Sequence, residues 1–567
     1  MNSKKTVAHH IRQFLLVIIS SLLFVLANPN LLFKEGLGFL GFFVYLPVLF
    51  VIKNSRLSDS WYLGAVYGAL TYALYGYWLK YFHPLGLALA VGSYTLILTF
   101  VFFCLKLIDL MFKKNAWLVQ WLFICAYEYV KTLGFAGMNY GVTAYTQWKY
   151  NYLIQICDVT GVFVFNLFVI FPSAFLFSLI YKSACRKKLI NNIELNNYVP
   201  DNPSQTSKTS EFVLKQKAVA FYSTRLSVSC AVIWCVLLLF FLVYGFCDIR
   251  QEGAARKMTV AAIQNNESPW KDGVEEYAKN VQKLMELTDE AFEMNDKIRL
   301  VVWPETAVVP SIMYNFYESR EPARYKLIVR LLEYIESSDA TFVIGNAHQN
   351  HNVQKGFLEK YNSAFVFEPG KNVFPPDPGI YFKMKLVPFT EEFPYETLFP
   401  RLYQRLLNGN LHMWEKGSEY KVFNCDVLSF ATPICFEDTF DYICRNMVLK
   451  GARCFVNLSN DSWSESVPCQ NQHLAMAVFR SVENRVPSVR STSSGKTCII
   501  NEHGKIVKSI PDFCYSYVIG QIPVFTTEYK MGFFTKNGNL LAQCEAALLL
   551  LILIIQFIRV IIIKKVN

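Results

Sequence analysis

The sequence lacks the motifs of a metal site. It has no C-x-x-C pair, no zinc-type spacing of cysteine and histidine, and no H-E-x-x-H. Its fifteen cysteines are an odd number, which does not favour a disulfide framework. Seven of them lie in or next to apolar segments, where small apolar filler is the ordinary role. We therefore expect no metal and no cofactor.

Charged residues are also scarce. They make up 17% of the chain, hydrophobic residues make up 53%, and the mean hydropathy is +0.25. A soluble chain of 567 residues would be less apolar. The net charge of +11 comes from cations in short loops between apolar runs, so membrane orientation explains it and nucleic-acid binding is not expected.

Eight apolar segments are candidates for membrane spans, because a bilayer core needs about 20 apolar residues per helix. They are residues 13–28, 36–52, 60–80, 86–112, 116–132, 159–181, 226–247 and 543–563. The first segment resembles a signal peptide but has no small-x-small cleavage site, which indicates an uncleaved anchor. An even number of spans places both termini on the same side of the membrane.

The loops between these segments alternate in charge. The cation-rich set comprises Lys4, Lys5 and Arg12, then Lys53 and Arg56, Lys113 and Lys114, the loop 182–225, and Lys564 and Lys565. The other set holds only isolated cations, Lys34 and Lys149. The positive-inside rule predicts cytoplasmic termini and an extracytoplasmic 248–540. The predicted divisions are thus 1–247, with a cytoplasmic loop at 182–225 that is flexible from residue 186, then 248–540, and 541–567.

Residues 248–540 have the pattern of an α/β domain. Strand-like runs are expected at 258–264, 298–303, 341–346, 362–368, 380–387, 427–435, 454–459, 488–492 and 497–502. Helical patterns at 274–292, 321–338, 438–449 and 468–485 separate several of them. This alternation favours an α/β domain with substantial sheet.

Three strand ends carry residues that could form one reactive set. Glu305 ends "VVWPE", Lys383 lies in "IYFKMKLVP", and Cys435 ends "FATPIC". Each alone is ordinary, as a capping acid, a surface lysine and a core cysteine. A thiol needs a base to become an effective nucleophile, and a carboxylate whose pKa is raised by burial can be that base. A cation can then stabilise the oxyanion of acyl transfer.

These residues resemble the catalytic set of the carbon–nitrogen hydrolase (nitrilase) superfamily, which has Glu, Lys and Cys in that order. The matching stretches are "WPET", "YFKMKLVPFTEEFP" and "PICFED". The wider chain resembles the bacterial apolipoprotein N-acyltransferase family in residues 128–166, 264–273, 361–364, 457–463 and 472–495. The resemblance implies a polytopic α-helical membrane protein of about eight spans, with a nitrilase-like αββα sandwich inserted between spans seven and eight.

The resemblance also implies a reaction. Cys435 would take an acyl chain from the sn-1 position of a phospholipid, typically phosphatidylethanolamine, as a thioester. The α-amine of the diacylglyceryl-cysteine of an apolipoprotein would then accept that chain, in the last step of bacterial lipoprotein maturation. Glu305 would be the general acid and base, and Lys383 would stabilise the oxyanion. The expected setting is the bacterial inner membrane, with a periplasmic catalytic domain and a monomeric chain.

Further residues match positions that support the site in the family. Glu391 would hold Lys383, Trp270 matches a functional tryptophan, and Phe436, Glu437 and Trp463 would line the site. Two positions depart from the family pattern. Thr390 stands where glycine is usual, and Phe436 stands where tyrosine is frequent, so a hydroxyl is lost.

Several readings stay open on the sequence alone. The apolar segment 393–414, with Leu406 and Leu407, is either a packed amphipathic helix or a lid on the outer leaflet. Glu128, an acid inside a span, is either functional or structural. The alternatives to an acyltransferase are a membrane-tethered amidase or nitrilase, and a non-enzymatic membrane protein with a degenerate domain.

Overall fold

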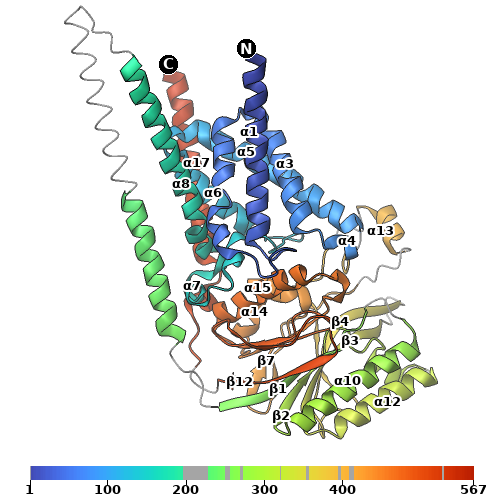
Figure 1. Ribbon diagram of the computed structural model, residues 1–567. Coiled ribbons are helices and arrows are strands. Elements are labelled where there is room, and N and C mark those ends of the chain that lie inside the picture. Colours follow the sequence, from blue (N-terminus) through green and yellow to red (C-terminus); the bar gives the residue numbers. More distant parts are fainter. Residues whose placement is uncertain are drawn as a thin grey trace, which may run out of the picture.

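The chain forms a bundle of apolar helices with a sheet-rich domain at one end (Figure 1). The structure is a computed structural model. It describes residues 2–82, 84–195, 228–249, 256–268, 272–319, 321–352, 357–393, 398–407, 414–525 and 529–566. Both termini lie at the end of the bundle that is far from the sheets (Figure 1).

In the described residues each of the eight predicted spans overlaps helix, and the second and third spans are each divided between two helices. The N-terminal part contains α1 (Asn2–Ala27), η1 (Gly38–Phe43), α2 (Leu46–Asn54), α3 (Leu57–Tyr75), α4 (Leu79–Phe82), α5 (Pro84–Phe112), η2 (Lys113–Asn115), α6 (Ala116–Val130), η3 (Thr143–Gln147), α7 (Asn151–Ile154) and α8 (Cys157–Leu195). A helix at Val228–Ile249 and α17 (Leu540–Val566) follow on either side of the sheet domain.

Five helical segments of the described residues are long and apolar enough to cross a membrane. They are Val7–Ala27, Leu85–Val130, Cys157–Cys185, Val228–Ile249 and Leu540–Ile562. The segment Leu85–Val130 holds two helices, α5 and α6, and the apolar stretch Gly38–Asn54 is shorter. These helices make the chain a multi-pass membrane protein, and the count of eight spans stays a prediction.

The predicted linker after α8 is partly wrong. The helix continues through residues 186–195, which were expected to be flexible, because lysine, leucine, isoleucine and glutamate in that stretch all tolerate helix well. Residues 196–227 lie outside the described part of the chain.

Glu128 is fully buried in the bundle and satisfied by neighbours. Its carboxylate accepts hydrogen bonds from the Tyr45 hydroxyl (2.5 Å), the Thr143 amide and hydroxyl (2.8 and 2.6 Å) and the Asn166 amide (2.7 Å). Four donors on one carboxylate tie three separate segments together. The contacts therefore support the structural reading of this acid.

The sheet domain is an αββα sandwich. One sheet has six strands in the order β12-β1-β2-β3-β4-β5, and the other has four in the order β11-β10-β9-β8. The strands of the first are β1 (Arg256–Gln264), β2 (Ile298–Val302), β3 (Thr341–Asn352), β4 (Phe357–Phe367), β5 (Gly379–Phe382) and β12 (Ser516–Val524). Those of the second are β8 (Phe455–Ser459), β9 (Ser488–Thr492), β10 (Cys498–Ile500) and β11 (Ile506–Ser509).

Helices cover the outer face of each sheet. The helices α10 (Val274–Met294), α11 (Ile312–Tyr317) and α12 (Pro322–Glu336) pack on the six-stranded sheet. The helices α14 (Asp441–Leu449) and α15 (Val467–Asn484) pack on the four-stranded sheet, between it and the bundle (Figure 1). The remaining elements are α13 (Pro400–Leu407), α16 (Phe533–Asn537), the hairpin of β6 (Phe423–Cys425) and β7 (Leu428–Phe430), and the turns η4 (Cys435–Thr439) and η5 (Ser462–Ser464).

Alternation along β1 builds the layers. Val260 and Ala262 belong to the core between the two sheets, and Ala261 and Ile263 belong to the core beneath α10 and α12. A strand whose two faces are both buried lacks the alternation of polar and apolar residues that marks a one-sided sheet. The run "MTVAAIQ" shows this pattern, as the sequence predicted.

Five expected elements differ from the structure by more than two residues at one end. The strand expected at 341–346 continues to Asn352, and the strand expected at 362–368 begins at Phe357. The strand expected at 380–387 ends at Phe382, and the strand expected at 427–435 is reduced to Leu428–Phe430 with isolated bridges at Ala431 and Ile434. Helix α14 starts at Asp441 instead of 438. The strands end at Phe382 and Phe430, just before the segments that carry Lys383 and Cys435, and the 3-10 helix η4 precedes α14. Short or edge strands that the sequence did not reveal are β6, β11 and β12.

Candidate active site

Cys435 is the first residue of the turn η4, which follows directly on a bridge to β8 at the edge of the four-stranded sheet. Ile434 still bridges Leu458, and η4 begins at Cys435, whose φ is +47°. A positive φ is uncommon for a residue with a side chain and is found where surrounding contacts impose it. Here the Ile434 amide donates to Glu437 (2.8 Å), and the Thr439 carbonyl accepts from Asn139 of the bundle (2.9 Å) and from Arg480 (3.0 Å).

Glu305 lies just after β2, as the sequence predicted. Its loop runs very close to β3. A Cβ added at Gly345 would lie 2.2 Å from the Pro304 carbonyl oxygen, so only glycine permits this approach of the two backbones. Val308 then bonds to the Gly345 carbonyl (3.0 Å), so the loop is fixed on both sides of Glu305, which is 7% exposed.

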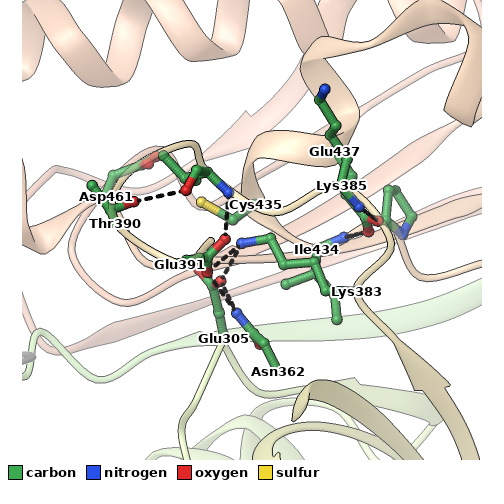
Figure 2. Close-up of polar contacts among 12 residues, drawn as sticks. Glu305, Asn362, Lys383, Lys385, Thr390, Glu391, Ile434, Cys435, Glu437 and Asp461 are labelled. Atoms are coloured by element: carbon green, nitrogen blue, oxygen red, sulfur yellow. Dashed lines mark hydrogen bonds and ion pairs between the residues drawn. The ribbon is translucent and has the colours of Figure 1, made fainter. Parts of the chain in front are cut away.

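Lys383 immediately follows β5 and is 1% exposed. Its backbone amide donates to the Asn362 carbonyl on β4 (2.9 Å). Its Nζ donates to Glu391 Oε1 (2.8 Å) and to Glu305 Oε1 (3.1 Å). The structure thus places the lysine between the two carboxylates that the sequence assigned to it (Figure 2).

Asn362 is a residue of this cluster to which the sequence gave no role. Its Nδ2 donates to Glu305 Oε1 (2.7 Å) and to Glu391 Oε1 (3.2 Å). It lies within the stretch "YNSA", which the sequence connects with the family by resemblance alone. An asparagine in the middle of a buried strand has to find polar partners, and that is the one signal that could have marked it.

Burial and charge set the ionisation of the cluster. Burial raises the pKa of Glu305, and Glu391 adds to this, while Lys383 and Asn362 oppose it. Burial also raises the pKa of the Cys435 thiol well above its usual range, Glu305 adds to this, and Lys383 opposes it. Burial would lower the pKa of Lys383, but the two carboxylates outweigh it and raise that pKa. At neutral pH the thiol is therefore protonated, and it needs a base to react.

Cys435 lies beside this cluster in Figure 2, on the side of Glu391 and Lys383. The arrangement brings together a thiol, a buried carboxylate and a buried ammonium from three strand ends. These groups can deprotonate a nucleophile and stabilise an oxyanion without a metal.

Glu437 has a different position from that of Glu305. Its Oε1 accepts from the Met384 and Lys385 amides (2.7 and 3.1 Å) and from the Tyr381 hydroxyl (2.9 Å). Its Oε2 accepts from Ile434. One carboxylate therefore joins the lysine loop to the cysteine turn. The predicted lining role of Glu437 becomes, in the geometry, a tie between the two loops.

The two aromatic residues assigned to the site have different neighbours. Phe436 is buried and packs edge-on against Phe440, with ring centroids 4.8 Å apart. Trp463 contacts Trp78 and Phe82 of the bundle, with ring centroids 5.7 and 5.2 Å apart.

Some assigned residues cannot be placed. Trp270 lies outside the described residues. In the segment 393–414, α13 is described, but residues 394–397 and 408–413 and the side chains of Leu406 and Leu407 are outside the described part. Leu398 and Phe399, which directly precede α13, are 68% and 55% exposed, and both the lid and the packed-helix interpretation stay open. All fifteen cysteines lie in described residues and are free thiols.

The sandwich and its cysteine–glutamate–lysine cluster define the class of the sheet domain. Residues 259–530 match the family model described as "Carbon-nitrogen hydrolase". Residues 20–175 match a second model, described as "Apolipoprotein N-acyltransferase N-terminal domain". The sheet domain is thus a carbon–nitrogen hydrolase domain carried by a membrane bundle.

Full-length relatives identify the family. The chain is 34% identical to "Apolipoprotein N-acyltransferase 1" of Treponema denticola, over 96% of this chain and 97% of that protein. It is 36% identical to "Apolipoprotein N-acyltransferase 1" of Treponema pallidum, over 95% of each chain. It is 30% identical to "Apolipoprotein N-acyltransferase" of Borreliella burgdorferi, over 92% of each chain. The chain belongs to the apolipoprotein N-acyltransferase family.

Proposed function

We propose that this protein transfers an acyl chain from a phospholipid, through a thioester on Cys435, to the N-terminal amine of a diacylated apolipoprotein. Family membership makes the chain an acyltransferase of lipoprotein N-acylation. It also sets aside the non-enzymatic alternative and disfavours the amidase. The donor, the covalent intermediate and the roles of the residues are the proposal.

The observation that supports the proposal is the placement of Cys435. The residue is held at positive φ beside a buried carboxylate and a buried ammonium. In the first step Glu305 takes the thiol proton and the sulfur attacks the ester carbonyl carbon. The carbonyl oxygen becomes an oxyanion, which Lys383 Nζ and a backbone N–H stabilise. The C–O bond then breaks, the leaving alkoxide takes the proton from Glu305, and a lysophospholipid departs.

The second step uses the same groups in the same order. The α-amine of the diacylglyceryl-cysteine attacks the thioester carbonyl, and Glu305 takes its proton. The C–S bond breaks and the sulfur recovers a proton. One buried carboxylate alternates between acid and base because burial raises its pKa toward those of its partners. Glu391 and Asn362 hold it and Lys383 in place.

The arrangement in the membrane is part of the proposal. Both chain ends lie at the bundle end remote from the sheets (Figure 1). In the alternation of loops along the sequence, the termini belong to the cation-rich set. We therefore place the termini in the cytoplasm and the catalytic domain, 248–540, outside the cytoplasm of a bacterial inner membrane. The flanking parts are 1–247 and 541–567. The site groups come from one chain, so a monomer suffices.

A trapping experiment tests the proposal. The protein in detergent is incubated with a phospholipid carrying distinct sn-1 and sn-2 chains, and intact mass is measured. We expect one sn-1 acyl group, labile to hydroxylamine, that a diacylated lipopeptide discharges as an N-acyl product. Cys435→Ala should take up none. Cys444→Ala, which removes a buried thiol of α14, should behave as the wild type.

Two results would count against the proposal. If Cys435→Ala still took up the acyl group, Cys435 would not be the nucleophile. Discharge by water or ammonia with no N-acyl product would favour the amidase.

A further inference from the structure

A buried histidine of α15 lies directly behind the nucleophile turn. His473 is 1% exposed. Its Nε2 is 2.7 Å from Asp438 Oδ1 and 3.2 Å from the carbonyl oxygen of Cys435. Its Nδ1 is 3.1 and 3.2 Å from the two carboxylate oxygens of Asp461. The mechanism described above does not use this residue.

The contacts decide the charge of the ring. Both nitrogens face carboxylates, and carboxylates only accept, so both nitrogens have to carry a proton. Burial would lower the pKa of His473, but Asp461 and Asp438 outweigh it and raise the pKa to about 9. Arg490 pairs with the other oxygen of Asp438, so two cations and two carboxylates balance in this buried group. The ring is an imidazolium at neutral pH.

The carbonyl of Cys435 belongs to the same peptide unit as the N–H of Phe436. In a trans peptide the two bonds point in opposite directions. Holding the carbonyl toward His473 therefore turns the Phe436 N–H to the other side of the turn. Within the described chain that N–H donates to no backbone carbonyl, whereas the Glu437 N–H donates to the Ile434 carbonyl (3.0 Å). Phe436 is buried, and the backbone N–H of a buried residue usually has an acceptor, so a bound substrate can supply one here.

We propose that His473 is a positioning residue, which fixes the Cys435–Phe436 peptide so that the Phe436 N–H donates to the oxyanion of each acyl-transfer step. The inference rests on the proposed thioester function. Asp461 and Asp438 hold the ring, the ring holds the carbonyl, and the carbonyl sets the direction of the donor. A positive charge near the carbonyl also polarises the peptide and strengthens its N–H as a donor.

Two substitutions separate positioning from simple support of the fold. His473→Gln places an amide NH₂ near the position of Nε2 and can donate to both Asp438 and the Cys435 carbonyl. His473→Asn is shorter, reaches only the side of Asp461 and leaves the carbonyl without its donor. The matched control is His348→Asn, at a buried histidine of β3 that contacts aromatic rings, among them Phe365 at 5.6 Å.

Two reactions of the same thiol give the readout. Acylation by phospholipid passes through an oxyanion, and alkylation by iodoacetamide does not. Loss of one oxyanion donor costs about 100- to 1000-fold in kcat, and a misdirected donor is expected to cost about 10- to 100-fold. His473→Asn should lose that factor in the acylation kcat, with little change in KM and an alkylation rate within about twofold of the wild type. His473→Gln should recover most of the loss, and the control should lose none.

The outcomes are distinct. Equal losses in acylation and alkylation, or equal losses in both His473 variants, would overturn the proposal in favour of a structural role. Should His473→Asn fail to fold, Asp461→Asn keeps the shape and weakens the hold on the ring. Asp461→Asn should then lower the acylation kcat by a smaller factor and leave the alkylation rate unchanged. If the acylation kcat did not fall more than the alkylation rate, the proposal would be overturned. A wild-type protein that forms no acyl thioester would instead refute the function on which the inference rests.

Discussion

Replacing Asn362 by leucine tests whether Glu305 is the base of the cluster. Leucine has nearly the same size and cannot donate, so Glu305 and Glu391 lose hydrogen bonds of 2.7 and 3.2 Å while the packing of β4 is kept. The Asn362 bond is one of the contacts that hold down the pKa of Glu305. Its loss favours the protonated form, so the carboxylate is available only at higher pH.

The magnitude follows from the kind of bond that is lost. A hydrogen bond to a charged group contributes about 1.5–3 kcal/mol. Each 1.4 kcal/mol corresponds to about tenfold in an equilibrium. On the acidic side of the profile, where the ionised fraction of Glu305 limits the rate, Asn362→Leu should lower acyl-enzyme formation by about 10- to 100-fold. Above the range in which Glu305 ionises, the rate should approach that of the wild type.

The assay is the pH dependence of the single-turnover rate of acyl-enzyme formation from phospholipid. The control is Asn315→Leu, which removes a buried asparagine whose Nδ2 donates to the Ser311 carbonyl (2.8 Å) away from the cluster. We expect the acidic limb of Asn362→Leu to move to higher pH and that of the control to stay in place. A uniform loss of rate at every pH would refute the reasoning, because it would show misplacement of the cluster and no change in ionisation.

Three further predictions concern other parts of the molecule. Lys383→Met should lower the free energy of unfolding by about 3–5 kcal/mol, because it leaves the buried Glu305 and the partly buried Glu391 without their cation; chemical unfolding in detergent measures this. The pKa of His473 is raised to about 9, so its contribution to stability is present at neutral pH and is lost as the pH rises through that value. The Tm should fall as the pH rises from about 7 to about 9, between the unfolded and folded pKa values, and it should fall less in His473→Gln. Leu398→Asp with Phe399→Asp should weaken acylation by phospholipid but spare acylation by a short, soluble ester, since both residues are exposed directly before α13.

Each of these predictions has an outcome that contradicts it. For Lys383→Met it is a stability equal to that of the wild type. For His473 it is a Tm profile that is the same in His473→Gln. For Leu398 and Phe399 it is an equal loss of acylation rate with the phospholipid and with the soluble ester. Val507→Asp, at an exposed position of β11, controls for the added charge.

Much of the membrane organisation could be predicted from the sequence, because hydrophobicity is a property of consecutive residues. All eight predicted segments overlap helix in the described residues, and the buried strands β1, β2 and β9 begin and end within two residues of the expected places. Cys435, Glu305 and Lys383 were predicted together from motifs at three strand ends. The strand limits at Phe382 and Phe430 were missed, since the chain leaves the sheet there for reasons of site geometry and local propensity does not encode them.

The partners of the reactive groups come from the tertiary structure alone. Asn362 contacts Glu305 across 57 positions of sequence, and Glu437 contacts the lysine loop across more than 50. His473 faces two aspartates and a carbonyl that no local pattern connects with it. The sequence by itself indicated the apolar segments and the three candidate reactive residues, because apolar runs and motifs are local. Only the fold showed that Glu437 ties two loops together and that Asp438 and Asp461 hold an imidazolium, because burial and partners are properties of the assembled sandwich.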